Sequence, residues 1–151
     1  MKHYIIDGNN VIHKIKKFEK LLQKDKQTPR ERLAFLIEDF FRGKHVKISL
    51  HYDGYERIPI KLDLIKIIYS SNKIADEKIK QEIESVSNTK NIAVVTSDDN
   101  LKDFARKCSC EVISSEDFIK MILKKEEPDE ETKKIDSINN TEYFKKLFGE
   151  K

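Results

Sequence analysis

Residue types that mark several protein classes are scarce in this chain of 151 residues, which has 2 cysteines, 4 glycines and no tryptophan. Two cysteines cannot build the disulfide framework of a small secreted domain, so we expect a reducing, cytoplasmic setting. No Gly-rich phosphate loop is present, which excludes a P-loop nucleotide enzyme. Because no apolar run approaches the length of a membrane span and no signal-peptide pattern opens the chain, we expect no membrane association.

What the chain has in abundance is charge. Charged residues make up 38% of it and apolar residues another 38%, which indicates one globular domain with a heavily solvated surface. Residues 1–50 contain 12 Lys and Arg against 6 Asp and Glu, an excess of six positive charges, although the total is only +3. A basic surface suits a polyanionic partner. It also fits an ordinary solvated helix face, and charge alone favours this second interpretation.

The hydrophobic pattern alternates strands with helices. Short apolar runs predict strands over residues 4–6, 46–52, 64–69, 91–96 and 111–113. Amphipathic spacing predicts helices over residues 11–24, 28–41, 74–86, 101–105 and 115–123. For the second helix, Thr28, Pro29 and Glu31 predict a capping-box start. One helix between most strands implies an α/β protein with a parallel sheet and right-handed crossovers.

The composition changes after the predicted domain of residues 1–123. Residues 124–140 combine dense mixed charge with a proline and only two apolar residues, Ile135 and Ile138, which predicts a flexible linker. Residues 141–151 regain apolar side chains and predict a short amphipathic helix. Such a helix either docks back on the domain or binds a protein partner, and docking in cis is the favoured expectation.

Acidic residues recur where the predicted strands end. Asp7 follows the first strand, Asp53 ends the second, and Asp98 and Asp99 follow the fourth. Asp76 lies in the first turn of a helix, on the stripe that faces the core. Ligands of α/β proteins bind at the carboxyl ends of the strands, so we expect these acids to meet in one crevice.

Clustered carboxylates cannot all ionise without a counter-charge, which Mg²⁺ or Mn²⁺ supplies. Such a site supports metal-assisted hydrolysis of phosphodiesters. Structural alternatives stay open for single acids, because a helix dipole alone can stabilise Asp76 and a helix cap can explain Asp98 or Ser97. At the first strand end, Gly8 permits the tight turn and Asn9 is expected to cap the helix that follows.

Four motifs follow one another along the chain: residues 5–12 (IIDGNNVI), 51–54 (HYDG), 75–79 (ADEKI) and 94–99 (VVTSDD). Together they resemble the NYN branch of the PIN-like ribonucleases, nearest its YacP-like group, and the resemblance spans residues 3–123. It implies a PIN-like three-layer α/β/α fold with a parallel sheet in the order 3-2-1-4-5. It also implies a metal-dependent endoribonuclease that uses Mg²⁺ or Mn²⁺ and acts on RNA, with mRNA at the ribosome as the expected substrate.

The resemblance also assigns roles to residues. Asp7, Asp76 and Asp98 are expected to bind the metal and carry catalysis, Asn10 to orient a ligand or phosphate, and Asp99 to complete the metal site. Supporting positions are expected for Asp53, Thr96 and Ser97, and RNA contacts for Lys14, Lys17, Arg30 and Lys73. The alternative is a catalytically inactive PIN-like module that binds RNA or the ribosome. The presence of both Asp76 and Asp98 favours catalysis.

Overall fold

A computed structural model describes residues 1–124 of the chain. In chain order its elements are β1 (Lys2–Asp7), α1 (Gly8–Lys14), α2 (Lys16–Leu22), α3 (Gln27–Phe41), β2 (Val46–Tyr52), β3 (Ile65–Tyr69), α4 (Ala75–Ser85), the short 3-10 helix η1 (Thr89–Asn91), β4 (Ile92–Val95), α5 (Asp99–Lys107), β5 (Glu111–Ile113) and α6 (Ser115–Leu123).

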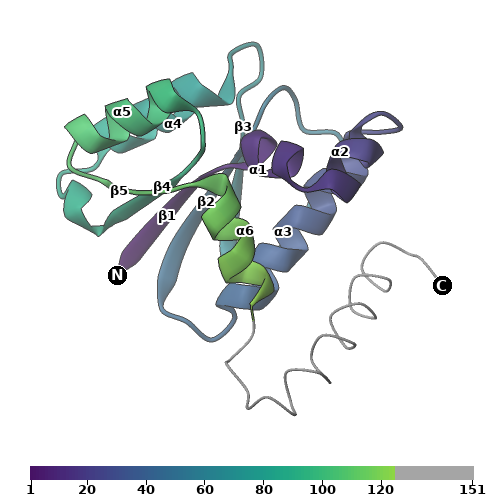
Figure 1. The fold of residues 1–151 in the computed structure, drawn as a ribbon, viewed down its shortest axis with the longest axis horizontal. Helices are drawn as coiled ribbons and strands as arrows, with labels where there is room; N and C mark the ends of the chain where they lie inside the picture. The colour runs from purple at the N-terminus through teal and green to yellow at the C-terminus, as the bar shows by residue number, and fades with distance from the viewer. Residues whose placement is uncertain (125–151) are drawn as a thin grey trace.

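The five strands form one sheet in the order β3-β2-β1-β4-β5, with every neighbouring pair parallel. Helices α4 and α5 cover one face, and α1, α2, α3 and α6 cover the other (Figure 1). The predicted three-layer α/β/α fold and strand order are therefore confirmed. The central strand β1 is buried on both faces, with Ile5 packed under α4 and α5 and Ile6 under the opposite layer.

The junction between β1 and α1 passes very close to the end of β2. A Cβ atom on Gly8 would lie 2.5 Å from Cε1 of Tyr52 and 2.7 Å from the carbonyl oxygen of His51. Only glycine fits this position without displacing the neighbouring strand. This close approach brings the carboxyl ends of β1 and β2 together.

The predicted helix over residues 11–24 is wrong in one respect, because it is two helices. Ile15 has an extended backbone (φ −105°, ψ 108°) that ends α1 and precedes α2. The bend changes the chain direction between Ile12 and Phe18, and both side chains are fully buried. Tertiary packing of these two residues decides the break, which helical spacing alone does not reveal.

The predicted second helix exists, but its capping box does not form. Helix α3 begins at Gln27, so Thr28 lies inside the first turn. The carboxylate of Asp25 accepts hydrogen bonds from the backbone N–H of Thr28 (2.7 Å) and from its hydroxyl (3.0 Å). Asp25 therefore provides the side-chain acceptor at the start of α3, the role that the sequence pattern assigned to Thr28.

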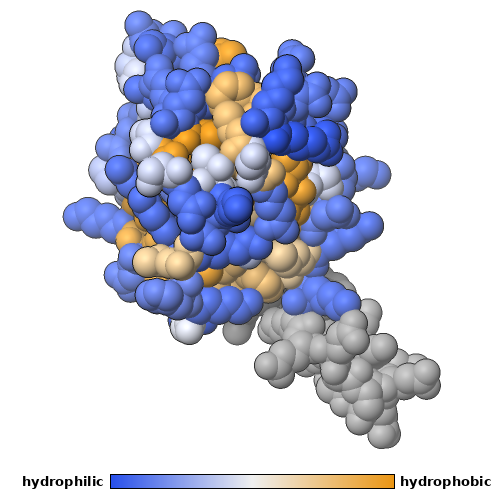
Figure 2. Space-filling model, turned by 90° about the vertical axis from the view of Figure 1, so that its left-hand side faces the viewer, coloured by the Kyte–Doolittle hydropathy of each residue, from blue (hydrophilic) through white to orange (hydrophobic). Residues whose placement is uncertain are grey.

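Helix α6 ends at Leu123. Residues 125–140 of the predicted linker over residues 124–140, and the predicted helix over residues 141–151, lie outside the described residues. Among residues 1–124, no helix has both the length and the apolar character needed to cross a membrane. The face shown in Figure 2 is covered mostly by hydrophilic side chains, with hydrophobic ones visible in patches between them.

Candidate active site

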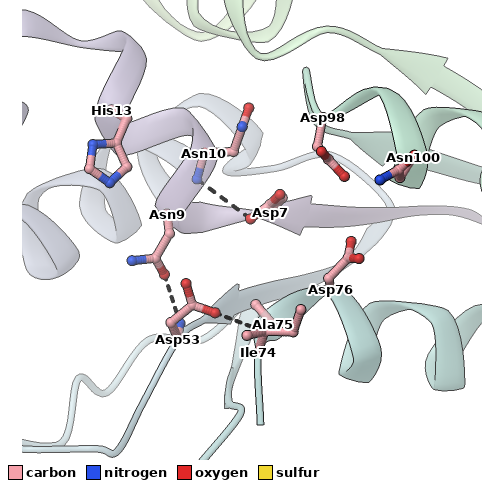
Figure 3. A pocket seen from close by; sticks show the side chains of 10 residues that line it. All are labelled: Asp7, Asn9, Asn10, His13, Asp53, Ile74, Ala75, Asp76, Asp98 and Asn100. Carbon is pink, nitrogen blue, oxygen red and sulfur yellow. Dashed lines mark hydrogen bonds between the residues drawn. The ribbon is translucent and has the colours of Figure 1, made fainter.

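A cavity of about 480 Å³ lies at the carboxyl edge of the sheet, where α1, α4 and α5 begin (Figure 3). Its walls are formed by Asp7, Asn9, Asn10, His13, Asp53, Ile74, Ala75, Asp76, Asp98 and Asn100. Four of the five predicted acids thus line one cavity, although they come from four separate parts of the chain. Strand order explains the convergence, since the carboxyl ends of the neighbouring strands β2, β1 and β4 share this edge.

Asp7 lies partly buried at the end of β1. Its Oδ2 accepts a hydrogen bond from the hydroxyl of Thr96 (3.0 Å), and its Oδ1 accepts a long one from the backbone N–H of Asn10 (3.5 Å). The pKa of Asp7 is raised to about 6: burial is the main cause, the nearby carboxylates of Asp53 and Asp76 add to it, and the two hydrogen bonds oppose it. The protein therefore holds this carboxylate at an energetic cost that a cation would offset.

Asp98 also lines the cavity and directly precedes α5. Its Oδ2 accepts a hydrogen bond from the backbone N–H of Leu101 (3.1 Å), so it caps this helix. Its own backbone N–H donates to the hydroxyl of Thr96 (3.1 Å), the group that also donates to Asp7. The fully buried Thr96 thus links Asp7 and Asp98 and fixes their relative positions.

Asp76 and Asp53 form the α4 side of the cavity. Asp76 lies in the first turn of α4 and points into the space faced by Asp7 and Asp98 (Figure 3). Its Oδ2 lies 3.5 Å from Nζ of Lys80, one turn further along the helix. Asp53 accepts a hydrogen bond at Oδ1 from the backbone N–H of Ala75 (2.6 Å). Its carboxylate is therefore partly committed to the start of α4, which agrees with a supporting position.

The two asparagines that follow Gly8 both line the cavity, and the predicted role of Asn10 in orienting a ligand or phosphate stays a prediction. Asp7, not Asn9, is the N-cap of α1, so the prediction that Asn9 caps this helix is wrong. Asn9 lines the cavity, and its Oδ1 accepts the backbone N–H of Asp53 (2.7 Å). Asn10 also lines the cavity, but its Oδ1 accepts the backbone N–H of Ser97 (2.9 Å) and the hydroxyl of Ser115 (2.6 Å). Asn10 thus ties α1 to the β4–α5 turn and to α6.

Ser97 faces α6 and is not among the residues that line the cavity. Its hydroxyl donates to the carboxylate of Glu116 (3.0 Å to Oε1) and accepts the backbone N–H of Ser115 (2.9 Å). The bonds of Asn10, Ser97 and Ser115 hold together three segments that carry or flank the acids. Ser97 therefore supports the site from behind without entering it.

The structure does not bring Asp99 to the other acids. Its side chain is 92% exposed, and its Oδ1 lies 3.5 Å from Nζ of Lys102. The expectation that Asp99 completes the metal site is wrong, because this exposed side chain is not among those that line the cavity. The neighbouring Asn100 lines the cavity instead, and the sequence offered no indication that it would do so.

The predicted RNA-contacting residues divide into two kinds. Lys14, Lys17 and Lys73 are exposed. Arg30 is only 3% exposed, and its guanidinium donates to the carbonyl oxygens of Asp53 (2.5 Å) and Tyr55 (3.0 Å). The expected RNA contact of Arg30 is therefore wrong, since this arginine holds the loop after β2 from inside the protein.

A divalent cation fits this cavity as a hydrated ion. The carboxylate and amide oxygens of its walls are hard donors of the kind that Mg²⁺ and Mn²⁺ prefer. Within residues 1–124, no three His, Cys, Asp or Glu side chains converge closely enough to hold a metal ion by themselves. Mg²⁺ does not require such a cage, because it keeps several waters and uses one or two carboxylates together with substrate phosphates.

Comparisons with known proteins place the chain in a family. A model of the YacP-like NYN domain matches residues 4–150. The solved structure of Rae1 (YacP) from Bacillus subtilis is similar with a TM-score of 0.67 at 16% identity, covering 97% of this chain and 83% of that one. A mutant of the same protein gives a TM-score of 0.68 at 17% identity, covering 80% and 74%.

At such identities the two structures show a shared fold alone, whereas the family match covers nearly the whole chain. No curated protein matches the chain. PIN-like nucleases generally use divalent metal ions, in agreement with the oxygen-rich walls of the cavity. The chain belongs to the YacP-like NYN domain family, a family of PIN-like ribonucleases.

Proposed function

We propose that this protein is a metal-dependent endoribonuclease that hydrolyses phosphodiester bonds in RNA, with Mg²⁺ or Mn²⁺ as its cofactor. The observation that carries the proposal is the convergence of Asp7, Asp76 and Asp98, from three separate elements, on one cavity at the carboxyl edge of the sheet. Membership of a PIN-like ribonuclease family supports the class of reaction.

In this proposal Asp7, Asp76 and Asp98 would hold the cation, one or two of them directly and the others through its bound waters. A bound Mg²⁺ or Mn²⁺ would supply charge neutralisation and activation of the attacking water. In the hydrolysis, the water oxygen bonds to phosphorus, the bond from phosphorus to the leaving oxygen breaks, and that oxygen takes up a proton. The hydroxyl of Thr96 orients the Asp7 carboxylate throughout, because its single proton is directed at Oδ2.

The proposed substrate is single-stranded RNA, including mRNA engaged by the ribosome, in the cytoplasm. The basic excess of the first 50 residues and the exposed Lys14, Lys17 and Lys73 support a polyanion. The part that concerns the ribosome rests on the family resemblance alone. Free Cys108 and Cys110 agree with a reducing compartment.

Two adjacent aspartates provide a matched test. We expect Asp98→Asn to abolish Mn²⁺-dependent cleavage of a 5′-labelled single-stranded RNA, because it removes a charge at the cavity while asparagine can still cap α5. The control Asp99→Asn removes the same charge one residue away, from an exposed side chain, and should retain full activity. Loss of wild-type cleavage in EDTA would support the metal requirement. Full activity of Asp98→Asn would refute the assignment.

The second candidate is an RNA-binding module without turnover. This candidate is supported by the structural roles of two of the acids: Asp98 caps α5, and Asp53 accepts a hydrogen bond from the backbone N–H of Ala75. If this is their whole role, wild-type protein should bind single-stranded RNA with the same affinity in Mn²⁺ and in EDTA, and should leave it intact. Cleavage that Asp98→Asn abolishes would exclude this candidate.

A further inference from the structure

A buried polar network lies beneath α4, on the same face of the sheet as Asp7 but outside the cavity. It consists of His3 on β1, Ser49 and His51 on β2, and Glu82 on α4, whose side chain is 18% exposed. His3, Ser49 and His51 are 6%, 0% and 1% exposed, so water does not explain their bonding. Nothing in the proposed reaction requires these residues, yet buried polar groups are costly unless they are fully paired.

The directions of the hydrogen bonds follow from chemistry. Ser49 donates its only proton to Oε2 of Glu82 (2.7 Å), so the Nε2–H of His3 must donate to the Ser49 hydroxyl (2.9 Å). The Nε2–H of His51 donates to the other oxygen, Oε1 of Glu82 (2.8 Å). Burial alone would raise the pKa of Glu82, but the bonds from His51 and Ser49 outweigh it, and the pKa lies below its ordinary value. Both oxygens of this ionised carboxylate are therefore used.

The same strand also holds the beginning of α4. Every second residue of an extended strand points to the same face, which here includes Ser49, His51 and, just after β2, Asp53. Oδ1 of Asp53 accepts a hydrogen bond from the backbone N–H of Ala75, the first residue of α4. Strand β2 and the residue that follows it thus form hydrogen bonds with α4 at two points, Ala75 and Glu82.

The distance between the two attachment points is about the same along α4 as along β2. From Ala75 to Glu82 an α-helix rises about 10 Å, at 1.5 Å per residue. From the midpoint of Ser49 and His51 to Asp53, an extended strand also advances about 10 Å. The apolar contacts of Ile79 and Ile83 choose which face of α4 is buried, but apolar contact is non-directional and tolerates sliding. The two polar attachments remove that freedom, because a shift of one residue would break both.

We propose that Glu82 is a remote positioning residue, which fixes the axial position of α4 on β2 and thereby sets where Asp76 stands relative to Asp7. Asp76 directly follows Ala75, the residue whose backbone N–H is held at the cavity end. The consequence for metal binding rests on the proposed function, since it presumes a divalent cation between these acids. Polar groups behind metal-binding residues commonly set metal affinity in this way.

The test requires a variant that still folds but lacks the hydrogen bonds between Glu82 and β2. Replacing Glu82 alone with an apolar residue would leave the protons of Ser49 and His51 buried without an acceptor. The double variant His51→Leu/Glu82→Leu avoids this, because the Ser49 hydroxyl can then donate to Nε2 of His3 in its other tautomer. Apolar replacement of a buried polar pair is often neutral for stability. Glu82→Gln is the conservative rescue, since an amide can still bond to both Ser49 and His51.

The first readout is amide hydrogen exchange of Ala75 in the absence of metal. As the first residue of α4 this N–H has no acceptor within the helix, so Asp53 alone protects it. We expect about tenfold faster exchange of this amide in the double variant, the equivalent of one lost hydrogen bond, with Ile83 unchanged as the measure of global stability. Glu82→Gln and the exposed control Glu84→Gln should stay within about twofold of wild type.

The second readout is Mn²⁺ affinity, measured by calorimetry with the metal alone. We expect the double variant to bind about 10- to 100-fold more weakly, and Glu82→Gln to restore most of the affinity. Unchanged exchange at Ala75 in the double variant would overturn the inference, as would unchanged Mn²⁺ affinity. A wild-type protein that binds no Mn²⁺ and cleaves no RNA would instead refute the proposed function, and exchange at Ala75 would still decide whether Glu82 positions α4.

Discussion

Replacing Asp7 with asparagine should stabilise the metal-free protein at neutral pH. Burial raises the pKa of Asp7 from 3.8 to about 6. At 1.36 kcal/mol per pKa unit, the ionised side chain costs the fold at most about 3 kcal/mol above pH 6. Asparagine removes this cost, but it accepts fewer hydrogen bonds than a carboxylate. Losing the hydrogen bond from Thr96 lowers the stability of the variant by about 1 kcal/mol. We therefore expect a net gain of about 2 kcal/mol in the free energy of unfolding at pH 7.5.

The pH dependence gives the prediction its sign. The raised pKa means that folded protein binds the Asp7 proton more tightly than unfolded protein does. The contribution of Asp7 to wild-type stability is therefore greatest below pH 3.8 and is lost as the pH rises through 6. Asp7→Asn should therefore be about 2 kcal/mol more stable than wild type at pH 7.5 and about 1 kcal/mol less stable at pH 3.5. Urea denaturation in EDTA at the two pH values measures both.

In the presence of metal, wild type should be more stable than Asp7→Asn. A cation that binds only the folded state stabilises it by mass action, and Asp7→Asn should lose most of that gain. The exposed Asp99→Asn is the control and should change stability by no more than about 0.5 kcal/mol at either pH. If Asp7→Asn instead destabilises the metal-free protein at pH 7.5, Asp7 serves the fold as the cap of α1, and the reasoning from burial is refuted.

Two further substitutions test how the site is held. Gly8→Ala places a Cβ 2.5 Å from the ring of Tyr52 and 2.7 Å from the His51 carbonyl, so it should lower the free energy of unfolding by about 1–3 kcal/mol in urea denaturation; an unchanged midpoint would contradict the close approach of β1 and β2. Arg30→Lys cannot donate to the carbonyls of both Asp53 and Tyr55 in the same fork geometry, and should make backbone amides of the loop after β2 exchange faster. The exposed Arg42→Lys is its control, and equal exchange in the two variants would show that Arg30 does not order the loop.

Most of the fold was accessible to sequence reasoning. Strands β2 and β5 and helix α6 have the predicted bounds, because their apolar periods are uninterrupted. The start of α3 was misassigned, since Asp25 and Thr28 are equally good capping types and only the backbone shows which one accepts the hydrogen bond. The break at Ile15 was missed for a similar reason, because a bend between two amphipathic turns leaves the helical spacing intact.

The candidate site divides in the same way. That Asp7, Asp76 and Asp98 line one cavity agrees with their predicted places at strand and helix ends, although their roles in metal binding and catalysis stay predictions. Asp99 differs from Asp98 by one residue, and in the first turn of a helix that step rotates a side chain by about 100°. Sequence cannot tell which of two adjacent acids faces the ligand until the first residue of the helix is known.

By itself, the sequence determined the alternation of strands and helices, the placement of acids at strand ends and the resemblance to a ribonuclease family. Each of these depends on local pattern or on short motifs. The tertiary structure decided what local pattern cannot encode. Arg30 lies inside the protein and not at its surface, and Asn10 joins three segments through its hydrogen bonds. Glu82, seven residues after Ala75, forms hydrogen bonds with two side chains of β2. Those contacts join residues far apart in the chain, so their partners are set only when the sheet and its helices pack.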